Sequence, residues 1–404
     1  MAGFNLSGFI ASRLQFRQGK SFSSTVIRIS GISIALGVAI LVISVVIQAG
    51  FRKEVNDRIF SFGGHLSIRQ FSSGSLYEES PVEQHSDFIR KLRHMPEIAS
   101  VQAFSYKPVL LSNEKEVAGL VLKGIDAGFN FPAFRSNFKN LPRKNFPDSG
   151  KIWVSGKLAR QLNLEKGSRV VAFFLQDPPR YRKLEVESIF ETALEDVDEH
   201  IAFVSIDLIR EINGWPAGSA GGFEVFVKDF QFLPQTLSKI EKIIPFDMGA
   251  EPVTQTHSQL FEWLDIIGRN VVIMFVLIAM VAGFNMAATL LIMVMERRQM
   301  IGILKALGAD DSLIRGIFIR NGLKILFRGL LAGNLAGIGF AFLQWKFRLI
   351  PLNPANYYLS SVPVGWDWVS IIGINAGVVM ISWFVILLPV KLVNRIRPAE
   401  AVRA

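Results

Sequence analysis

Apolar and polar positions vary on two scales along this chain. On the long scale, four runs of about twenty or more mainly apolar residues interrupt the sequence. Because a helix rises about 1.5 Å per residue, some twenty residues match the ~30 Å hydrocarbon core of a bilayer. We therefore predict four membrane-spanning helices, at residues 29–49, 266–295, 321–343 and 369–390.

The third run is the least apolar of the four. Lys324 and Arg328 lie inside it, but with Arg320 they are four residues apart and share one helical face, from which they can reach the cytoplasmic interface. Glycine also recurs every fourth residue, and such a strip lets two helices approach closely. We expect a tight helix contact at Gly329, Gly333 and Gly337.

The first run could instead belong to a cleaved signal peptide. It begins nearly thirty residues into the chain and is longer than the usual apolar region of about 7–15 residues, so a retained anchor is favoured. Before it, residues 1–28 place apolar side chains at helical spacing beside basic ones, which predicts an amphipathic helix in the inner membrane interface. These residues are Leu6, Phe9, Ile10 and Leu14, with Arg13, Arg17 and Lys20.

On the short scale, residues 50–265 alternate strand-like and helix-like blocks, which indicates an α+β domain of one or two lobes. Residues 126–150, rich in Phe, Asn and Pro, suggest an irregular excursion. The predicted strands are Gly63–Phe71, Ala99–Leu111, Glu116–Gly124, Lys151–Val154, Gly167–Leu175, Leu184–Phe190, His200–Val204 and Phe223–Lys228. The predicted helices are Val82–His94, Gly156–Leu162, Asp207–Asn213 and Leu233–Ile244.

A loop at Gln176–Lys183 separates two of these strands. Pro178 and Pro179 stiffen it and remove backbone donors, and the residues after them predict a positive, amphipathic tip. Those residues are Arg180, Tyr181 and Arg182. An ordinary hairpin tip without a binding role explains the same pattern.

The net charge of +10 is unevenly distributed. Segments 1–28, 296–328 and 391–404 hold 15 Lys/Arg against 4 Asp/Glu, while the rest holds 29 against 30. Basic segments beside membrane spans mark the cytoplasmic side, so both termini and the 296–320 loop are predicted inside, and residues 50–265 and 344–368 outside. Charge partitioned in this way argues against a nucleic-acid-binding surface.

The sequence offers little catalytic chemistry. Cysteine is absent, which excludes disulfides and cysteine-based metal sites. Gly19-Lys20-Ser21 lacks the earlier glycine of a phosphate-binding loop, because position 14 is Leu14. The acidic stretch at residues 195–199 is interpreted as a solvated turn. The histidines show no metal-ligand spacing, at His65, His85, His94, His200 and His257. We expect no catalytic site, metal or cofactor in this chain.

The segment ERRQMIGILKALGADD, residues 296–311, predicts a short amphipathic helix that ends at Gly308. Ile301, Leu304, Ala306 and Leu307 would form its apolar face. A short helix fixed to a membrane span can dock into a groove of a partner protein, although an interfacial helix without a partner has the same pattern.

Together with its flanks, that segment resembles the second span and coupling helix of the FtsX/MacB-like permeases of ABC transporters. FIASRL near the N-terminus, the first span with Gly50-Phe51 after it, GHLSI, IFETALEDVDEHIAFVSIDLIREING and RIRPAEAVRA resemble the LolC/LolE family of lipoprotein-releasing systems in the same order. The resemblance implies an α-helical membrane protein with four transmembrane helices and a large α+β periplasmic domain, the MacB-like periplasmic core, between helices 1 and 2.

It further implies a permease in the inner membrane of a Gram-negative bacterium, which extracts lipoproteins for a LolA-like periplasmic carrier. A LolD-like ATPase would hold ATP and Mg, and a second permease chain would complete the complex. The ATPase-coupling element would be Glu296, Arg297, Arg298, Ile301, Gly302, Leu304, Lys305, Leu307 and Gly308. The cavity for acyl chains would include Val42, Val45, Val46, Phe275 and Leu277, and the loop from Pro178 to Arg182 would meet the carrier.

Other functions fit parts of the pattern. A MacB-like exporter or an FtsX-like mechanotransmission permease would share the fold, although a MacB-like chain would also carry an ATPase domain, which this sequence does not show. A membrane sensor would need a cytoplasmic output domain, and the longest predicted cytoplasmic segment has about thirty residues. A membrane enzyme would need catalytic residues, and we identify no candidates.

Overall fold

The computed structural model describes residues 22–71, 79–113, 115–138, 140–192, 194–352, 359 and 361–390. Most of the predicted N-terminal amphipathic helix and the tail at 391–404 lie outside these ranges. The chain divides into two compact units, which we call the helical unit and the sheet domain. Among the described residues, the helical unit holds 22–52, 263–351 and 361–390, and the sheet domain holds most of 53–262.

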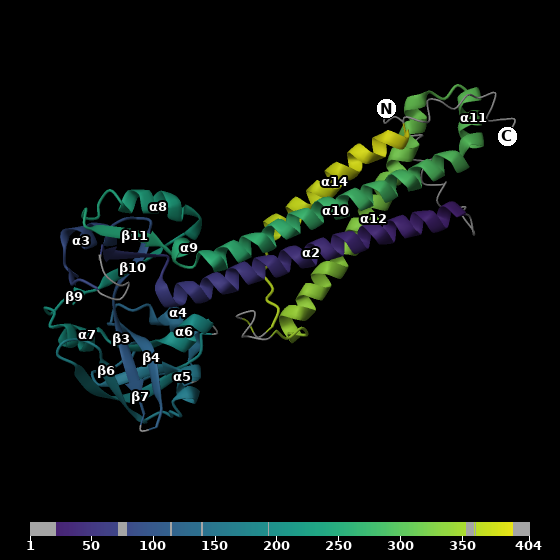
Figure 1. Ribbon diagram of the computed structural model, residues 1–404. Coiled ribbons are helices and arrows are strands. Elements are labelled where there is room, and N and C mark those ends of the chain that lie inside the picture. The colour runs from purple at the N-terminus through teal and green to yellow at the C-terminus, as the bar shows by residue number, and fades with distance from the viewer. Residues whose placement is uncertain are drawn as a thin grey trace. The chain divides into compact units, whose positions relative to one another are not determined.

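Four helices in the described part of the chain are long and apolar enough to cross a membrane, which confirms the predicted number of spans. Three of them extend well beyond the apolar runs that predict them, because helical hydrogen bonding continues through polar residues outside the hydrocarbon core. They are α2 (Phe22–Gly63), α10 (Ser258–Glu296), α12 (Asp311–Phe347) and α14 (Trp368–Val390), and Figure 1 shows each as a long ribbon.

The glycine strip of α12 forms the close helix contact that its spacing predicts, and its partner is α2. A Cβ atom placed on Gly333 would lie 2.6 Å from the carbonyl oxygen of Ala35, and one on Gly329 would lie 2.7 Å from Cγ2 of Ile34. One on Gly337 would lie 3.0 Å from Cβ of Val42. Only glycine permits this spacing, so the two helix backbones are in contact along about two turns of α12.

An adjacent side of α12 is tied to α14 by a reciprocal pair of amides. The side-chain nitrogen of Asn334 donates to Oδ1 of Asn375 at 2.7 Å, and that of Asn375 donates to Oδ1 of Asn334 at 3.0 Å. Each amide also donates to the carbonyl four residues earlier in its own helix. Because these polar groups satisfy each other, they can lie between apolar helices at low cost.

The sheet domain contains a nine-stranded sheet in the order β11-β1-β10-β3-β4-β8-β5-β7-β6. β3 also pairs with β6 through Leu111 and Ala172, so the strands from β3 to β6 close into a barrel, and the first four form an open sheet. The bounds are β1 Leu66–Gln70, β3 Ile98–Ser112, β4 Val117–Ile125, β5 Lys151–Ser155, β6 Arg169–Phe174, β7 Arg180–Phe190, β8 Ile201–Ser205, β10 Gly222–Val227 and β11 Met248–Pro252. β2 (Val82–Glu83) and β9 (Ser219–Ala220) form a separate small sheet.

β3 belongs to both halves of this domain. Its first residues pair with β10 up to Phe104, and from Ser105 onward it pairs with β4. Each half has its own apolar core, centred on Leu122 and Val154 in the barrel and on Ile68 and Phe223 in the open sheet. The shared strand therefore makes one continuous body of the two predicted lobes.

Short helices cover both halves. They are α3 (Asp87–Arg93), α4 (Phe131–Phe134), α5 (Gly156–Gln161), α6 (Glu195–His200), α7 (Ile206–Asn213), α8 (Leu233–Ile240) and α9 (Val253–Thr256), with 3-10 turns η1 (Arg135–Asn137) and η2 (Phe230–Phe232). The predicted helix at Val82–His94 is shorter, because its first two residues pair with β9. The predicted excursion at 126–150 contains α4 and η1, and Phe134 packs there against Phe190 and Phe203 of the barrel.

The acidic stretch at 195–199 is the helix α6 rather than a solvated turn. Asp198 is buried and its carboxylate accepts hydrogen bonds from the backbone and the hydroxyl of Thr192, at 3.0 and 2.8 Å. Glu195 and Glu199 are paired with Lys157. Lys157 lies on a different element, α5, so the local sequence could not reveal this pairing.

Candidate functional site

The segment after α10 forms the predicted amphipathic helix, α11 (Arg298–Ala306). Ile301 and Gly302 are buried against the helical unit, and Leu304 packs on the same core. The opposite face is apolar and exposed: Ile303 is 55% and Leu307 79% accessible. α11 is thus held by one face and leaves a second apolar face open.

The turn after α11 is built to be rigid. Gly308 has a left-handed backbone with φ of 89°, and the amides of Gly308 and Ala309 donate to the carbonyls of Lys305 and Leu304 at 3.0 and 2.9 Å. This is a Schellman cap, which favours glycine at the left-handed position. Asp310 then caps α12 by accepting from the amide of Leu313 at 3.3 Å. Two helices therefore meet at a fixed angle.

The predicted coupling residues have four different surroundings in the structure. Glu296 and Arg298 are exposed and Arg297 is half-buried, at the junction of α10 with α11. Lys305 is paired with Asp311 at 2.9 Å, so its charge helps to hold α11 on α12. Ile301 and Gly302 anchor the helix, whereas Leu307 is free to contact a partner.

Ile303 is absent from the predicted coupling set although it lies on the exposed face. The sequence placed the apolar face on Ile301, Leu304, Ala306 and Leu307, but α11 is apolar on two sides, and only the position of the neighbouring helices separates the anchoring side from the free one. In the structure the free side is Ile303, Ala306 and Leu307.

The predicted acyl-chain cavity is largely internal in this chain. Val42, Val45 and Val46 are buried, and Val42 contacts Gly337 of α12. Phe275 is half-buried, and a Cβ on Gly377 of α14 would lie 2.6 Å from its ring. Leu277, by contrast, is 55% accessible. Of the five predicted residues, Leu277 is therefore the one with a largely open side chain.

A different stripe of α2 is open to lipid or to a partner. It lies on one helical face, because its members are three or four residues apart. The exposed residues are Ile29, Ile32, Leu36 and Ile40. Sequence reasoning missed this stripe because α2 is apolar all round, so its periodicity does not distinguish the buried face from the free one.

The predicted loop at 176–183 is shorter than expected, because β7 begins at Arg180 and only 175–179 connect it to β6. Its arginines do not form a free positive tip. Arg180 donates to the carbonyls of Glu211 and Ile212 at 3.0 Å, and Arg182 pairs with Glu211 at 2.6 Å. These contacts place both cations at the C-terminal end of α7, where the helix dipole favours them.

The exposed part of this hairpin is apolar instead. Tyr181 and Phe173 lie opposite each other on β7 and β6, with ring centroids 6.4 Å apart, and both are exposed. Leu175 is also exposed, and Pro178 and Pro179 follow it. The structure thus replaces the predicted positive tip with an apolar one.

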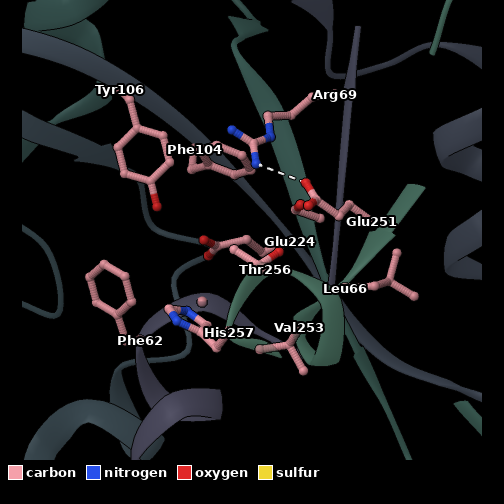
Figure 2. Close-up of a pocket in the computed structure, with 12 residues that line it drawn as sticks. Phe62, Leu66, Arg69, Phe104, Tyr106, Glu224, Glu251, Val253, Thr256 and His257 are labelled. Atoms are coloured by element: carbon pink, nitrogen blue, oxygen red, sulfur yellow. Dashed lines mark hydrogen bonds and ion pairs between the residues drawn. The ribbon is translucent and has the colours of Figure 1, made fainter. Parts of the chain in front are cut away.

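A buried ionic cluster in the sheet domain has no counterpart among the predicted sites. Lys123 of β4 and Glu224 of β10 form an ion pair at 2.6 Å, with side chains 0% and 3% accessible. Burial lowers the pKa of Lys123, and Glu224 opposes that shift. Glu224 borders a cavity of about 60 Å³, and Phe62, Phe104 and Tyr106 also line it (Figure 2). A lysine in a strand pattern suggests a solvent-facing position, so this pair could not be predicted from the pattern.

Two further groups near the cluster have shifted pKa values. Burial raises the pKa of Glu79 to about 8, even though its Oε2 accepts from the amide of Tyr106 at 2.8 Å. Burial also lowers the pKa of His65 to about 4. The ring of His65 lies against Phe60, and its Nδ1 accepts from the amide of Val227 at 2.8 Å.

Among the residues that the structure describes, there is no group of three or more histidine, aspartate or glutamate side chains placed to hold a metal ion. The features with functional potential are therefore the open face of α11, the open stripe of α2, the apolar hairpin tip and the buried cluster.

Residues 272–398 match the model of the FtsX-like permease C-terminal domain. The chain is also 24% identical to the lipoprotein-releasing system transmembrane protein LolC of Neisseria meningitidis, over 99% of both chains. It is 22% identical to LolE of Haemophilus influenzae, over 98% of this chain and 99% of that one. The periplasmic region of MacB from Actinobacillus actinomycetemcomitans covers 49% of this chain with a TM-score of 0.32 and 12% identity.

The chain is therefore a multi-pass membrane protein with an FtsX-like permease domain. Over nearly its whole length it is similar to LolC and LolE, in agreement with the resemblance that its motifs indicate.

Proposed function

We propose that this chain is the membrane subunit of an ABC transporter that extracts lipoproteins from the inner membrane of a Gram-negative bacterium. The observation that carries the proposal is its similarity to LolC and LolE, which extends through both the helical unit and the sheet domain. A MacB-like exporter and an FtsX-like mechanotransmission permease remain the alternatives that an experiment must exclude.

The proposed orientation places both termini and α11 in the cytoplasm and the sheet domain in the periplasm. It is supported by the excess of lysine and arginine in segments 1–28, 296–328 and 391–404. In the reverse orientation these segments would have to cross the membrane, and the nearly neutral sheet domain would stay inside.

ATP hydrolysis is assigned to a separate, LolD-like chain, which would hold ATP and Mg²⁺. The open face formed by Ile303, Ala306 and Leu307 supports this assignment, since an apolar helix face of this size suits a groove on a partner. The rigid turn at Gly308 would pass a displacement of α11 directly to α12. A second permease chain, identical or related, would complete the transporter.

Energetics explain why such a chain would need an ATPase. Moving three acyl chains of about 14 methylenes each from lipid into water costs on the order of 30 kcal/mol, at ~0.8 kcal/mol per methylene. A protein cavity that replaces one apolar environment by another removes most of that barrier. We assign its walls to the open stripe of α2 and to Leu277, whose apolar side chains are exposed in the part of the chain that the structure describes.

The periplasmic carrier would be a LolA-like protein. The hairpin tip supports a contact with it, because Leu175 and Tyr181 are exposed on a short, proline-stiffened connection. Replacement Leu175→Asp should then slow transfer to the carrier while ATP hydrolysis continues. Equal transfer by wild type and variant would remove the hairpin from the carrier site.

Depletion of the chain in cells tests the function itself. Lipoproteins that are destined for the outer membrane should accumulate in the inner membrane within the time that the protein is lost. Co-purification should recover a chain with a Walker-type ATPase motif. Normal lipoprotein distribution after depletion, with a defect in cell-wall hydrolysis or export instead, would favour one of the alternatives.

A further inference from the structure

The C-terminal end of α2 is fastened inside the sheet domain by the side chain of Lys123. Phe62 is the second-last residue of α2, so its carbonyl has no amide partner within the helix. Gly64 leaves the helix with a left-handed φ of 71°, and the next amide, that of His65, donates to the carbonyl of Val225 rather than to Phe62. Nζ of Lys123 donates to the Phe62 carbonyl at 2.5 Å.

A residue of the open sheet, Glu224, holds the side chain of Lys123 in place. Its Nζ donates to Oε1 of Glu224 at 2.6 Å, and Oε2 of Glu224 accepts from the side chain of Gln102 at 2.6 Å. The side-chain oxygen of Gln102, Oε1, accepts from the backbone amide of Asn130 at 2.7 Å. Each polar atom of this chain of bonds has a partner, so the arrangement has one preferred geometry.

Aromatic rings shield the cluster from water. The ring of Phe62 has its centroid 4.3 Å from Nζ of Lys123, and the rings of Phe104 and Tyr106 lie at 5.8 Å. Figure 2 shows these three rings around Glu224. Electrostatic contacts in a buried site of this kind are stronger than in water. Removing one partner therefore costs more free energy than it would at the surface.

Three parts of the protein meet at this one side chain. Phe62 ends α2, the helix that also contains the first membrane span; Lys123 lies on the barrel side of the sheet, and Glu224 on the open-sheet side. Only two residues separate α2 from β1, which pairs with β10 at Glu224. A displacement of α2 along or about its axis would therefore disturb the contact between the Phe62 carbonyl and Lys123.

We infer that Lys123 is a positioning residue for transport, which couples the end of α2 to both halves of the sheet domain through Phe62 and Glu224. The inference rests on the proposed function. Stability alone does not account for the pair, because apolar residues of similar volume often replace a buried ion pair without loss of stability. An apolar side chain could fill the space of Lys123, but it could not bind the Phe62 carbonyl.

The double variant Lys123→Met/Glu224→Leu separates packing from coupling. It is studied in the full complex with its ATPase in lipid nanodiscs, where release of a purified lipoprotein and ATP hydrolysis are measured together. We expect hydrolysis within about twofold of wild type and release roughly tenfold lower, which is within the usual range of coupling between distant sites. The matched control is Glu187→Gln, a buried barrel carboxylate that binds Trp153 and Lys151.

A distance measurement gives a readout that loss of stability alone would not change. The chain has no cysteine, so spin labels can be placed at Lys53→Cys on α2 and Glu185→Cys on β7 without a background. The distribution of distances between them should be narrow in wild type and in Glu187→Gln, and broad in the double variant. Unchanged release together with an unchanged distribution in the double variant would overturn the inference.

Glu224→Gln serves if the double variant fails to assemble, because it keeps the shape of the side chain and removes its charge. Release reduced several-fold would support the inference, and release equal to that of Glu187→Gln would contradict it. The proposed function fails in a different way: a wild-type complex that releases no lipoprotein refutes that function, while the distance distributions still decide whether Lys123 fastens α2.

Discussion

Gly333 of α12 and Ala35 of α2 are in backbone contact, since a Cβ on Gly333 would lie 2.6 Å from the Ala35 carbonyl oxygen. The next nearest atom to such a Cβ is Cβ of Val38, at 2.8 Å. Neither atom is the far end of a flexible side chain. A larger residue at this position must therefore separate the two helices.

Gly333→Val should consequently destabilise the helical unit by about 1–3 kcal/mol, the usual cost of overpacking. The measurement is thermal unfolding of the purified chain in detergent. Gly339→Ala is the matched control, because a Cβ at Gly339 of the same helix meets nothing within 4 Å. Equal midpoints for the two variants would show that α2 and α12 are not packed as described.

The reciprocal amides of Asn334 and Asn375 predict non-additive effects. Asn334→Leu alone leaves one amide without its partner and should cost about 1 kcal/mol, near the measured range for polar contacts between membrane helices. Asn334→Leu/Asn375→Leu should cost less than the sum of the single variants. Additive losses in a double-mutant cycle would indicate that the two side chains do not interact.

The two sides of α11 predict opposite phenotypes. Ile303→Asp lies on the open face and should abolish stimulation of the partner ATPase while the unfolding midpoint stays unchanged. Ile301→Val removes one buried methyl group and should cost about 0.5–1.5 kcal/mol, with coupling preserved. ATPase stimulation is measured for both in the assembled complex. Loss of stimulation in Ile301→Val alone would mean that the open face is not the contact surface.

The raised pKa of Glu79 predicts that the sheet domain loses stability as the pH rises. Its folded pKa of about 8 exceeds the ordinary 4.5 of a glutamate, so between these values the folded state binds more protons than the unfolded state. Stability should fall with pH in that window, with a slope of at most about 1.4 kcal/mol per pH unit.

His65 acts in the other direction and at lower pH. Its folded pKa of about 4 lies below the ordinary 6.5, so its contribution to stability increases as the pH rises from about 4 to 6.5. Above pH 6.5 the slope should therefore come from Glu79. Hydrogen exchange of the Tyr106 amide between pH 6.5 and 8, corrected for intrinsic rates, measures it. Glu79→Gln should flatten the profile, and a slope that survives this change would exclude Glu79.

Hydropathy predicted the membrane spans, and glycine spacing predicted a close helix contact on α12, because both signals lie in the local sequence; that α2 is the partner came from the structure. The spans were underestimated at their ends for a physical reason: hydropathy reports where lipid begins, whereas α2 continues through Arg52 and Arg58 by ordinary helix hydrogen bonding. The start of β7 was missed in a similar way. Arg180 is polar, but it pairs with Phe174 of β6 and so belongs to the strand.

Tertiary partners decided the remaining differences. Nothing local to Lys123 indicates that Glu224, a hundred residues later, neutralises it in the interior. Nothing in the α2 sequence separates Val42, which contacts α12, from Ile40, which remains exposed. The charged and apolar patterns were correct, but the surfaces they form depend on which neighbour covers them.

The closure of β3 on β6 limits where another polypeptide could add a strand. Within the nine-stranded sheet, the barrel strands have both neighbours, and the unpaired border is that of β11. That border is only Met248–Pro252 long and ends in a proline, which cannot donate to an incoming chain. The sheet domain would thus resist pairing its strands with those of other copies, even at high local concentration.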